Sequence, residues 1–421
     1  MPRFPDGGRA SLLPGRLAAE ATALAASPHA GPYHDRMHAP AETVAAVRRA
    51  FPVLGITRLA RVTDLDRVGI PVFLAIRPNS RTLAVTQGKG IDDDAAKASA
   101  VMEAAEQAIA EQVQPAGLVA TVDALQTGGE AYVPPSRFLR KGHGVPDGAI
   151  DWIEGFDLLG GRRAWVPRHA VRLDFTERHP VAHPFWQSSD GLAAGNILLE
   201  AVLHGLCERI ERDASALWSF RSSNQVAARC VDPSAFADPV LSRLATRIAD
   251  ASLCLRLFDI TSDIGVPVYF AVIAEQHPTG RDWRHFDLSR GTGCHPIASR
   301  AAIRAVTEAA QSRLTAISGA RDDFWPGLYD APLRPDLHVF RLAEPHPIPV
   351  IEGPATRRTD LGAILDRLRV RGVRSVVVVP LGGEEFGIAV AKIIVPDLED
   401  PPESRHKRLG RRAVNAMLEA A

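Results

Sequence analysis

The sequence predicts an α/β (α+β) fold whose core is a duplicated strand–turn–helix unit around a glutamate-lined site. Two observations indicate this fold class. Short runs rich in β-branched and aromatic residues alternate along the chain with longer Ala-rich segments of helical periodicity. Two of the resulting units are also similar to each other, although they lie in different halves of the chain. Such a duplication predicts a pseudo-symmetric α/β body.

The two copies of the unit can be followed residue by residue. GIPVFLAIRP at residues 69–78 predicts a strand, and GVPVYFAVIAE at residues 265–275 is nearly its copy. Each strand has a similar lead-in, LARVTDLDRV before the first and LRLFDITSDI before the second. Each is followed by a glycine turn, GKG at residues 88–90 or GTG at residues 291–293, and then by an Ala-rich helix.

The remaining elements complete one compact unit. A turn-rich section with short strand signals separates the two copies and is followed by a helical segment at residues 195–214. SVVVVPL and GIAVAKIIVP predict two late strands joined by the turn GGEEF. We therefore expect residues 1–35 to form a weakly helical N-terminal arm and residues 36–415 to form a single domain of several parts.

Composition excludes several classes of protein. The 421-residue chain has 49 basic and 49 acidic residues, so its charge favours neither nucleic acid nor an anionic membrane as a partner. No run of about 18 apolar residues predicts a membrane span, and the Ala-rich start lacks the pattern of a signal peptide. The four cysteines include no CxxC pair, which favours a reducing compartment. We expect a cytoplasmic protein.

The segment GNILLEAVLHGLCERIERDA at residues 195–214 predicts a helix with two distinct faces. At 100° per residue, the four polar residues fall within an arc of about 120°; they are Asn196, Glu200, Glu208 and Glu211. The opposite side is apolar and consists of Leu199, Val202, Leu203, Leu206 and Ile210. An acidic surface helix has a similar amphipathic pattern, but the polar face here lacks interleaved lysines and its pattern recurs elsewhere in the chain.

The pattern recurs on the Ala-rich helix of each repeat. Ser99, Glu103 and Glu106 share one face of the first, and Arg300, Arg304, Glu308 and Gln311 share one face of the second. If the three polar faces converge, their glutamates require positive charge. Mg²⁺ supplies it, because Mg²⁺ takes oxygen ligands and bridges one or two carboxylates to phosphates, while arginines bind phosphate oxygens.

No standard nucleotide motif accompanies these faces. The sequence has no GxxxxGK[ST], and no GxGxxG follows a predicted strand. The GKG segment allows two interpretations, a backbone that lies against phosphate or a turn that exposes Lys89. Spacing alone therefore predicts a cation site, with a nucleotide as its possible ligand.

Three segments resemble the signature regions of YcaO-domain proteins. They are GKGIDDDAAKASAVMEAAEQ, SSDGLAAGNILLEAVLHGLCERIERDA and SRGTGCHPIASRAAIRAVTEAAQSRL, and the ending AKIIVPDLEDPPESRHKRLGRRA is also similar. The resemblance covers about residues 36–412 in the expected order. It implies an enzyme that uses ATP and Mg²⁺ to phosphorylate a backbone amide oxygen after a nucleophile has added, which yields an azoline, thioamide or amidine.

The resemblance also implies roles for individual residues. Glutamates of the two ExxE motifs and of the NxxxE motif are the implied Mg²⁺ ligands: Glu103, Glu106, Glu200, Glu208 and Glu211. The implied ATP-contacting residues are Arg36, Thr43, Lys89, Ser99, Asn196, Arg304 and Gln311, with Glu308 in the same motif segment as the last two. One departure is Gln107, where an arginine commonly follows the first ExxE. No general base is assigned, so the catalytic residue is left open.

The subtype is implied by further similarities. HDRMHAPAET, GITRLARVTDLDRVGIPV and RPNSRTLAVTQGKG are most similar to YcaO proteins that act with a TfuA-like partner in thioamide formation, and the end of the chain lacks a PxPxP tail. The resemblance then implies a peptide or protein substrate, an external sulfur donor and a homodimer, which is common in the family. An azoline-forming cyclodehydratase and a non-catalytic nucleotide-binding scaffold are the alternatives. All five motif glutamates are present, which favours an active enzyme over the scaffold.

Overall fold

The strands of the computed structural model form three antiparallel sheets. The structure describes residues 12–27, 33, 36–113, 118–176, 184–276, 282–347, 349–350, 353, 361–400 and 409–420. The first sheet contains β1 (Arg58–Arg61), β2 (Val72–Ile76) and β3 (Val85–Lys89). The second has the order β11 (Leu288–Cys294), β10 (Val268–Glu275), β9 (Leu253–Asp259) and β8 (Cys230–Val231).

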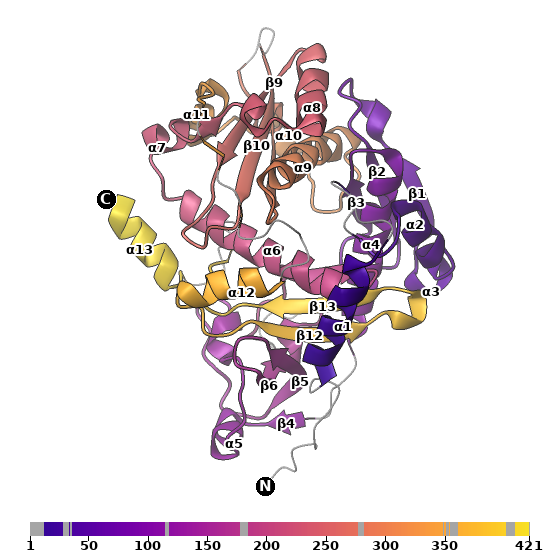
Figure 1. Ribbon diagram of the computed structural model, residues 1–421, viewed down its shortest axis with the longest axis vertical. Helices are drawn as coiled ribbons and strands as arrows, with labels where there is room; N and C mark the ends of the chain where they lie inside the picture. Colours follow the sequence, from indigo (N-terminus) through magenta and orange to yellow (C-terminus); the bar gives the residue numbers. More distant parts are fainter. Residues whose placement is uncertain are drawn as a thin grey trace.

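The third sheet is built largely from segments outside the two repeats. Its order is β4 (Leu118–Ala120), β5 (Ile150–Asp157), β12 (Val377–Gly382), β13 (Ala389–Ile394) and β7 (Leu192–Gly195), and β6 (Arg162–Pro167) pairs with β5. The two late strands predicted around GGEEF are thus β12 and β13, which are antiparallel neighbours. The third sheet lies at the bottom of Figure 1, with the second sheet at the top and the first at the right.

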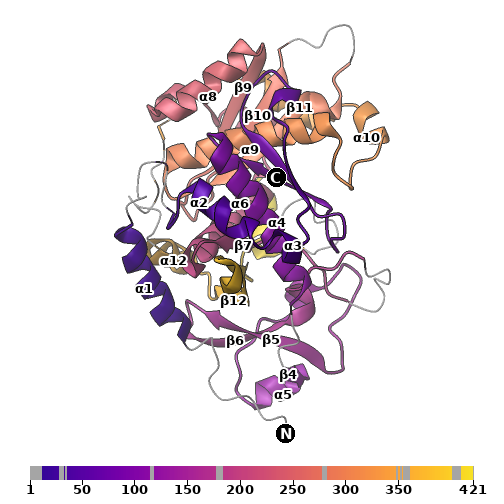
Figure 2. The ribbon, with the colours of Figure 1, turned by 90° about the vertical axis from the view of Figure 1, so that its right-hand side faces the viewer.

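Helices fill the space between the sheets. The three longest are α4 (Asp93–Glu111), α6 (Leu198–Trp218) and α9 (Ala298–Ser318), and they correspond to the three helices predicted from periodicity. The shorter ones are α1 (Leu13–Ala25), α2 (Pro40–Arg48), α3 (Phe51–Leu54), α5 (Val122–Thr127), α7 (Ser223–Ala227), α8 (Pro239–Asp250), α10 (Gly327–Asp330), α11 (His338–Leu342), α12 (Leu361–Val370) and α13 (Arg411–Ala420). In the orthogonal view of Figure 2, α9 lies above α6 and α4, and β5 and β6 lie below them. None of the described helices combines the length and the apolar character that a membrane span requires.

The duplication predicted from the sequence is present as two units of three strands and one helix. In the first unit β1, β2 and β3 are followed by α4, and in the second β9, β10 and β11 are followed by α9. The glycines that the sequence placed in turns lie instead in or directly beside strands: Gly88 pairs with Phe73 across the first sheet, and Gly293 pairs with Tyr269 across the second.

Close packing between strand and helix explains these glycines. A Cβ atom on Gly88 would lie 2.1 Å from the backbone nitrogen of Ala100, and one on Gly293 would lie 2.3 Å from the carbonyl oxygen of Ala301. No side chain fits at such distances, so α4 and α9 rest directly on β3 and β11. The small side chains of both helices have the same cause, because larger residues would separate helix from strand.

The same contacts fix which residues of the two repeats correspond. Gly88 contacts Ala96 and Ala100, whereas Gly293 contacts Ala301 and Ala305. Counting along each helix from these alanines pairs Ser99 with Arg304, Glu103 with Glu308, and Glu106 with Gln311. GKG therefore does not correspond to GTG position by position; Gly88 corresponds to the second glycine of GTG.

Helix α6 is central, and its predicted apolar face is confirmed. Leu199, Val202, Leu203, Leu206 and Ile210 are all buried, and α6 packs on β7, β11 and β13. The polar face is also enclosed, since Glu200 and Glu211 are 2% and 6% exposed. An amphipathic surface helix is thereby excluded. Asn196 precedes the helix, which begins at Leu198.

The N-terminal segment predicted as an arm contains α1, which is packed against the body. Leu13, Leu17 and Leu24 are buried in the same core as the apolar face of α6. The carboxylate of Glu20 accepts a hydrogen bond from the backbone N–H of Leu199 at 2.7 Å. This bond satisfies a free donor in the first turn of α6, whose own N-cap residue, Ile197, provides no side-chain acceptor.

Gly88→Ala tests the close packing of α4 on β3. The added methyl group forces the helix away from the strand, and we expect the free energy of unfolding to fall by about 2 kcal/mol or more, since overpacked cores lose about 1–3 kcal/mol. Urea denaturation followed by circular dichroism measures the change. Gly144→Ala is the matched control, because a Cβ there meets nothing within 4 Å. Equal stability of the two variants would contradict this account of the glycine.

Candidate functional site

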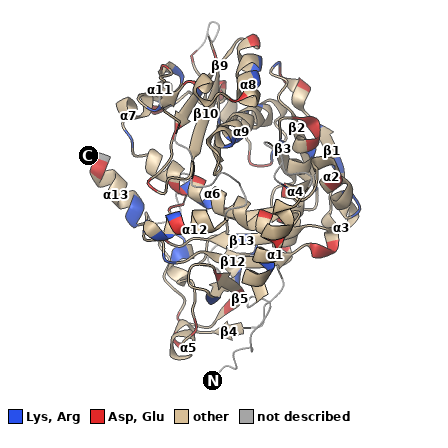
Figure 3. Ribbon diagram, viewed as in Figure 1, with Lys and Arg blue, Asp and Glu red and all other residues tan. Residues whose placement is uncertain are grey.

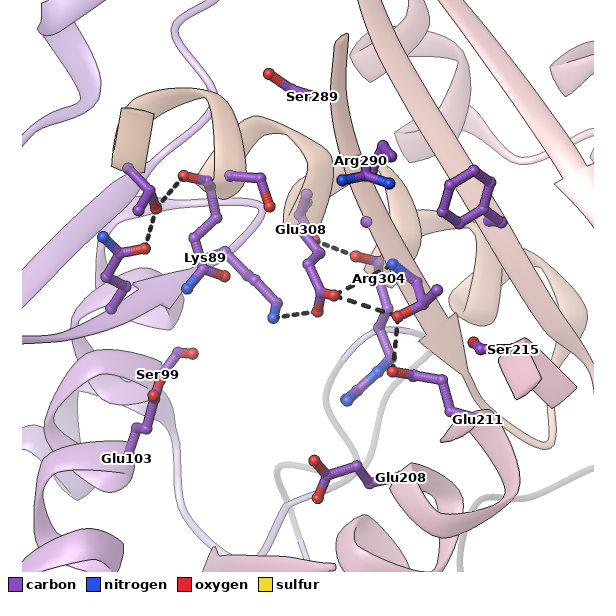
Figure 4. A pocket seen from close by; sticks show the side chains of 18 of the residues that line it. Lys89, Ser99, Glu103, Glu208, Glu211, Ser215, Ser289, Arg290, Arg304 and Glu308 are labelled. Atoms are coloured by element: carbon purple, nitrogen blue, oxygen red, sulfur yellow. Dashed lines mark hydrogen bonds and ion pairs between the residues drawn. The ribbon is translucent and has the colours of Figure 1, made fainter. Parts of the chain in front are cut away.

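A cavity of about 1200 Å³ opens between α4, α6 and α9. It brings together every predicted site residue except Glu200: Arg36, Thr43, Lys89, Ser99, Glu103, Glu106, Asn196, Glu208, Glu211, Arg304 and Gln311. In Figure 4, Ser99 and Glu103 on α4 face Glu208 and Glu211 on α6 across open space, with Lys89 and Glu308 beyond them. Acidic and basic residues occur in many helices and loops of the ribbon in Figure 3, so the grouping of glutamates at the cavity is local.

One set of hydrogen bonds joins α6, β11 and α9. The Thr292 hydroxyl lies 2.8 Å from Glu211 Oε1 and 3.3 Å from Glu308 Oε1. The second oxygen of Glu211 accepts the backbone N–H of Cys294 at 2.9 Å. The Lys89 ammonium lies 2.7 Å from Glu308 Oε2 and joins the first repeat to the second. Lys89 therefore points into the cavity and neutralises a carboxylate, contrary to the interpretation of GKG as a turn with an exposed lysine.

Glu208 belongs to a second ionic group. Its Oε2 accepts the backbone N–H of Gly191 at 3.0 Å, and Arg212 approaches its Oε1 at 3.3 Å. Arg212 also lies 3.3 Å from Asp190 Oδ1. Glu208 and Arg212 are four residues apart on α6, the spacing at which helical neighbours of opposite charge meet.

Glu200 is held by the protein and does not reach the cavity. Its Oε2 accepts bonds from Arg36 at 3.1 Å and from the backbone and side-chain nitrogens of Asn196 at 3.0 and 3.1 Å. Its Oε1 accepts the backbone N–H of Met37 at 2.6 Å. The Thr43 hydroxyl in turn donates to Asn196 Oδ1 at 2.7 Å. Four predicted residues thus form one cluster, in which Glu200 positions Arg36 and Asn196 at the cavity wall.

Helix α9 contributes polar atoms that lack partners among the described residues. Arg304 Nη2 contacts His204 Nε2 at 3.2 Å, but its buried Nε has no hydrogen-bond acceptor. The buried Oε1 of Gln311 has no donor. Unsatisfied buried polar groups are rare in folded proteins and call for an explanation such as an absent ligand. Both residues line the cavity, where an anion with further polar groups would satisfy them.

The carboxylates of α4 and α6 have perturbed acidities. Burial raises the pKa of Glu103 to about 7, against the ordinary value of 4.5. Burial and the charges of Glu103 and Glu208 raise the pKa of Glu106 well above that value, and burial also raises the pKa of Glu208 and of Glu211. Burial alone would raise the pKa of Glu308, but the charge of Lys89 holds it below the ordinary value.

This donor set fits Mg²⁺ bound together with phosphate. Mg²⁺ requires hard oxygen ligands, keeps several waters and is usually held by one or two carboxylates plus phosphate oxygens. Among the described residues, no three His, Cys, Asp or Glu side chains stand close enough together to coordinate one ion. The cavity therefore offers carboxylate oxygens that need further ligands from a phosphate and from water.

The sequence prediction assigned no role in the site to four residues that lie in or near it. Glu308 occupies the position in the second repeat that Glu103 occupies in the first, and faces the same cavity. Arg212 and Arg321 line the cavity and offset the charges of Glu208 and Glu103. Lys392 on β13 is buried near Glu106 and Glu208. Glu308 had a local signal in the helical face that it shares with Arg304 and Gln311, and Arg212 had one in its four-residue spacing from Glu208, whereas Arg321 and Lys392 had none.

Gln107, the departure from the expected arginine, is accommodated by a different contact. Its Oε1 accepts a hydrogen bond from the Thr82 hydroxyl at 3.0 Å. Positive charge near the first ExxE comes instead from Lys89 and from Arg321, which follows α9, and both lower the pKa of Glu103 against the effect of burial. Lys89 and Arg321 thus supply part of the positive charge that an arginine at residue 107 would have added.

Comparison with known proteins identifies relatives of similar length. A family model described as YcaO cyclodehydratase, ATP- and Mg²⁺-binding, matches residues 87–399. An uncharacterized protein in the tfuA 3′ region of Rhizobium leguminosarum bv. trifolii is 44% identical over 398 residues, which are 91% of this chain and 93% of that protein. An uncharacterized protein of Methanothermobacter thermautotrophicus is 34% identical over 396 residues, 90% of this chain and 98% of that protein.

Two solved structures share the fold. A heterocyclase in complex with substrate and cofactor superposes with a TM-score of 0.71 at 23% identity, over 87% of this chain and 53% of that chain. The present chain thus spans about half the length of the heterocyclase. A YcaO protein from Methanopyrus kandleri, bound with AMPPCP and Mg²⁺, superposes with a TM-score of 0.66 at 22% identity, over 89% of this chain and 96% of that chain.

Glu106→Gln tests the repulsion among the carboxylates. Removing one charge from a group of buried like charges should raise the free energy of unfolding by about 1 kcal/mol at pH 8 without Mg²⁺, and should reduce the further stabilisation by Mg-AMPPCP. Thermal denaturation with and without Mg-AMPPCP measures both effects. Glu385→Gln, at an exposed position, is the control. A Glu106→Gln protein less stable than wild type in Mg²⁺-free buffer would contradict the repulsion.

The raised pKa of Glu103 predicts a pH dependence. Since the folded state without Mg²⁺ binds this proton more tightly than the unfolded chain, its stability should fall as pH rises from about 4.5 through about 7. Mg²⁺ binds the carboxylate form, so the affinity for Mg-AMPPCP should rise over the same range, with proton release near pH 6.5. Calorimetry in buffers of different ionisation enthalpy measures that release. Unchanged proton release in Glu103→Gln would contradict the assignment of the released proton to Glu103.

Proposed function

This chain belongs to the YcaO family, whose domain binds ATP and Mg²⁺, and we propose that it activates a peptide or protein backbone amide and converts it to a thioamide. The observation that carries the ATP-dependent part is the cavity itself. Carboxylates from α4, α6 and α9 face one space together with Lys89, Arg304 and the unsatisfied Gln311. Mg²⁺ supplies the positive charge that the carboxylates require, and the triphosphate of ATP supplies acceptors for Lys89 and Arg304.

We assign the residues as follows within this proposal. Mg²⁺ is held by the carboxylates that reach the cavity, and ATP contacts the polar residues around them; the Mg²⁺ ligands are Glu103, Glu106, Glu208, Glu211 and Glu308. Lys89 and Arg304 lie beside the phosphates and offset their charge. Glu200 is assigned to the site as the carboxylate that orients Arg36 and Asn196, because its carboxylate accepts hydrogen bonds from those residues and from Met37. Positioning and electrostatics account for most of the rate in phosphoryl transfer.

The reaction balances with sulfide as the nucleophile. Hydrosulfide adds to the amide carbon, the amide oxygen takes the γ-phosphoryl group of ATP, and the carbon–oxygen bond then breaks. The products are a thioamide, ADP and inorganic phosphate, with the hydrosulfide proton carried by the phosphate. None of the four cysteines, all of them described, is among the residues that line the cavity. The sulfur therefore comes from outside this chain.

The relative in the tfuA 3′ region supports the thioamide subtype. At 44% identity over nearly the whole of both chains, it connects this chain with a genetic neighbourhood that contains tfuA. We therefore propose a TfuA-like partner that assists delivery of the substrate or of sulfur. Consumption of ATP fits the cytoplasmic location expected from composition, and a homodimer remains part of the proposal.

Azoline formation is the second candidate. The structural likeness to a heterocyclase and the cyclodehydratase description of the family model favour it. In that reaction a side chain of the substrate supplies the nucleophile, and no external sulfur is needed. A non-catalytic scaffold has less support, because every motif glutamate is present and those of α4, α6 and α9 converge except Glu200.

Mass spectrometry of the modified peptide distinguishes these candidates. The protein is incubated with Mg-ATP, sulfide, the TfuA-like protein of the same organism and the peptides encoded near its gene. Replacement of oxygen by sulfur is the expected result, whereas loss of water indicates an azoline. Glu211→Gln should lower ATP turnover by about 100-fold or more while the protein stays folded, and Glu385→Gln should not. Wild-type turnover in Glu211→Gln would overturn the site.

A further inference from the structure

The cavity extends beyond the carboxylates to a second part with different chemistry. We call it the aromatic end and define it by Trp218, Phe270, Phe286, Phe324 and Phe340, all of which line the cavity. Four of the rings form two pairs: the ring centres of Phe286 and Phe324 are 5.3 Å apart, and those of Phe270 and Phe340 are 5.1 Å apart. Aromatic walls of this kind bind apolar or aromatic side chains of a ligand.

The volume of the cavity leaves room for a ligand besides the nucleotide. Single small-molecule sites in proteins usually enclose about 300–1,000 Å³, and this cavity encloses about 1200 Å³. Trp218 of the aromatic end is the last residue of α6, seven residues beyond Glu211. A magnesium–nucleotide complex bound at the glutamates therefore leaves the aromatic end for a second molecule.

Positive charge accompanies the aromatic rings. Arg221, Arg290 and Arg334 line this part of the cavity, and Asp336 is the one acidic residue among the described residues lining it. Asp336 is already held by Arg334 at 2.9 Å. The charges of Arg290 and Arg334 both act on His285, so these groups are clustered. Arg221 and Arg290 add positive charge to the Arg334–Asp336 pair, and this charge favours a ligand that carries negative charge.

The aromatic end also contains a hydrogen-bond donor without an acceptor among the described residues, the indole N–H of Trp218. Trp218 is 8% exposed. The guanidinium of Arg221 lies 5.7 Å from the centre of the same ring. A carbonyl or carboxylate oxygen of a bound peptide provides the acceptor that the indole lacks.

We propose that the aromatic end binds the acceptor peptide, through an apolar or aromatic side chain and a carboxylate that lie about three residues from the amide to be modified. This inference rests on the proposed function. The spacing follows from α6: Trp218 is seven residues beyond Glu211, about 10 Å along the helix at 1.5 Å per residue. An extended peptide spans that distance with about three residues. The carboxylate belongs either to an acidic side chain or to the C-terminus of the peptide.

Binding of matched peptides to the full chain, saturated with Mg-AMPPCP, tests this proposal. The parent probe is acetyl-GAAFD-amide, in which Phe and Asp follow the glycine at the proposed spacing. Three changes are compared with it, namely Asp to Asn, Asp to Lys and Phe to Ser. A further arm, acetyl-GAAFN with a free C-terminal carboxylate, distinguishes the two sources of the negative charge. Dissociation constants are measured by calorimetry.

We expect the Asn and Ser probes to bind about tenfold more weakly than the parent, and the Lys probe more weakly still. Restored affinity in the free-carboxylate arm assigns the charge to the peptide C-terminus, and failure to restore it assigns the charge to an acidic side chain. Arg221→Gln and Arg290→Gln should reduce the preference of Asp over Asn to about threefold or less. Arg243→Gln, on the exposed side of α8, is the matched control and should keep the tenfold preference.

Two results overturn the inference while the proposed function stands. One is tight binding of Mg-AMPPCP with no discrimination among the peptides, or with no peptide binding. The other is a preference for Asp that Arg221→Gln and Arg290→Gln both leave unchanged, because the carboxylate is then recognised elsewhere. Absence of Mg-AMPPCP binding by the wild-type protein overturns the proposed function itself, so the two failures are distinguishable.

Discussion

The structure depends on how it holds several carboxylates around one cavity. Glu103, Glu106, Glu208, Glu211 and Glu308 lie where the effective dielectric is lower than in water, so their repulsion is stronger than on a surface. The protein offsets only part of this charge, through Lys89, Arg212 and Lys392. The burial and the negative charge that remain raise the pKa values of the glutamates on α4 and α6. A fold that keeps such repulsion at its centre requires positive charge from a ligand, and the Mg²⁺ that this family binds together with ATP supplies it.

Duplication explains how the site acquired two unlike halves. Glu103 and Glu308 occupy equivalent positions on α4 and α9. Each of these helices contacts a strand glycine through two alanines, and the two pairs of alanines lie at matching positions of the repeats. At the other equivalent positions the repeats have diverged. The first repeat carries Ser99 and Glu106 where the second carries Arg304 and Gln311. The two halves therefore present different polar groups to the cavity, although they share the glutamate pair Glu103 and Glu308.

The surrounding framework fixes α6, which lies between these halves. At its start, Glu20 of α1 accepts the Leu199 N–H. Near its end, the fully buried Asp213 accepts two bonds from Arg412 of α13, at 2.8 and 2.9 Å, and one from the backbone N–H of Glu399. Segments from opposite ends of the chain thus anchor the helix that carries Glu208 and Glu211. Because carboxylates that repel one another tend to move apart, such anchoring keeps the site assembled.

The sequence by itself determined the three long helices, their polar and apolar faces, the paired repeats and the late strands β12 and β13. These features are local, since helical and strand periodicity depend on neighbouring residues alone. Family resemblance added the roles of the glutamates, which spacing could not provide. Only the tertiary structure decided that Lys89 pairs with Glu308, that Glu200 is enclosed by Arg36 and Asn196, and that Gly88 touches α4. Each of these contacts depends on how closely separate elements pack, and periodicity contains no information about that distance.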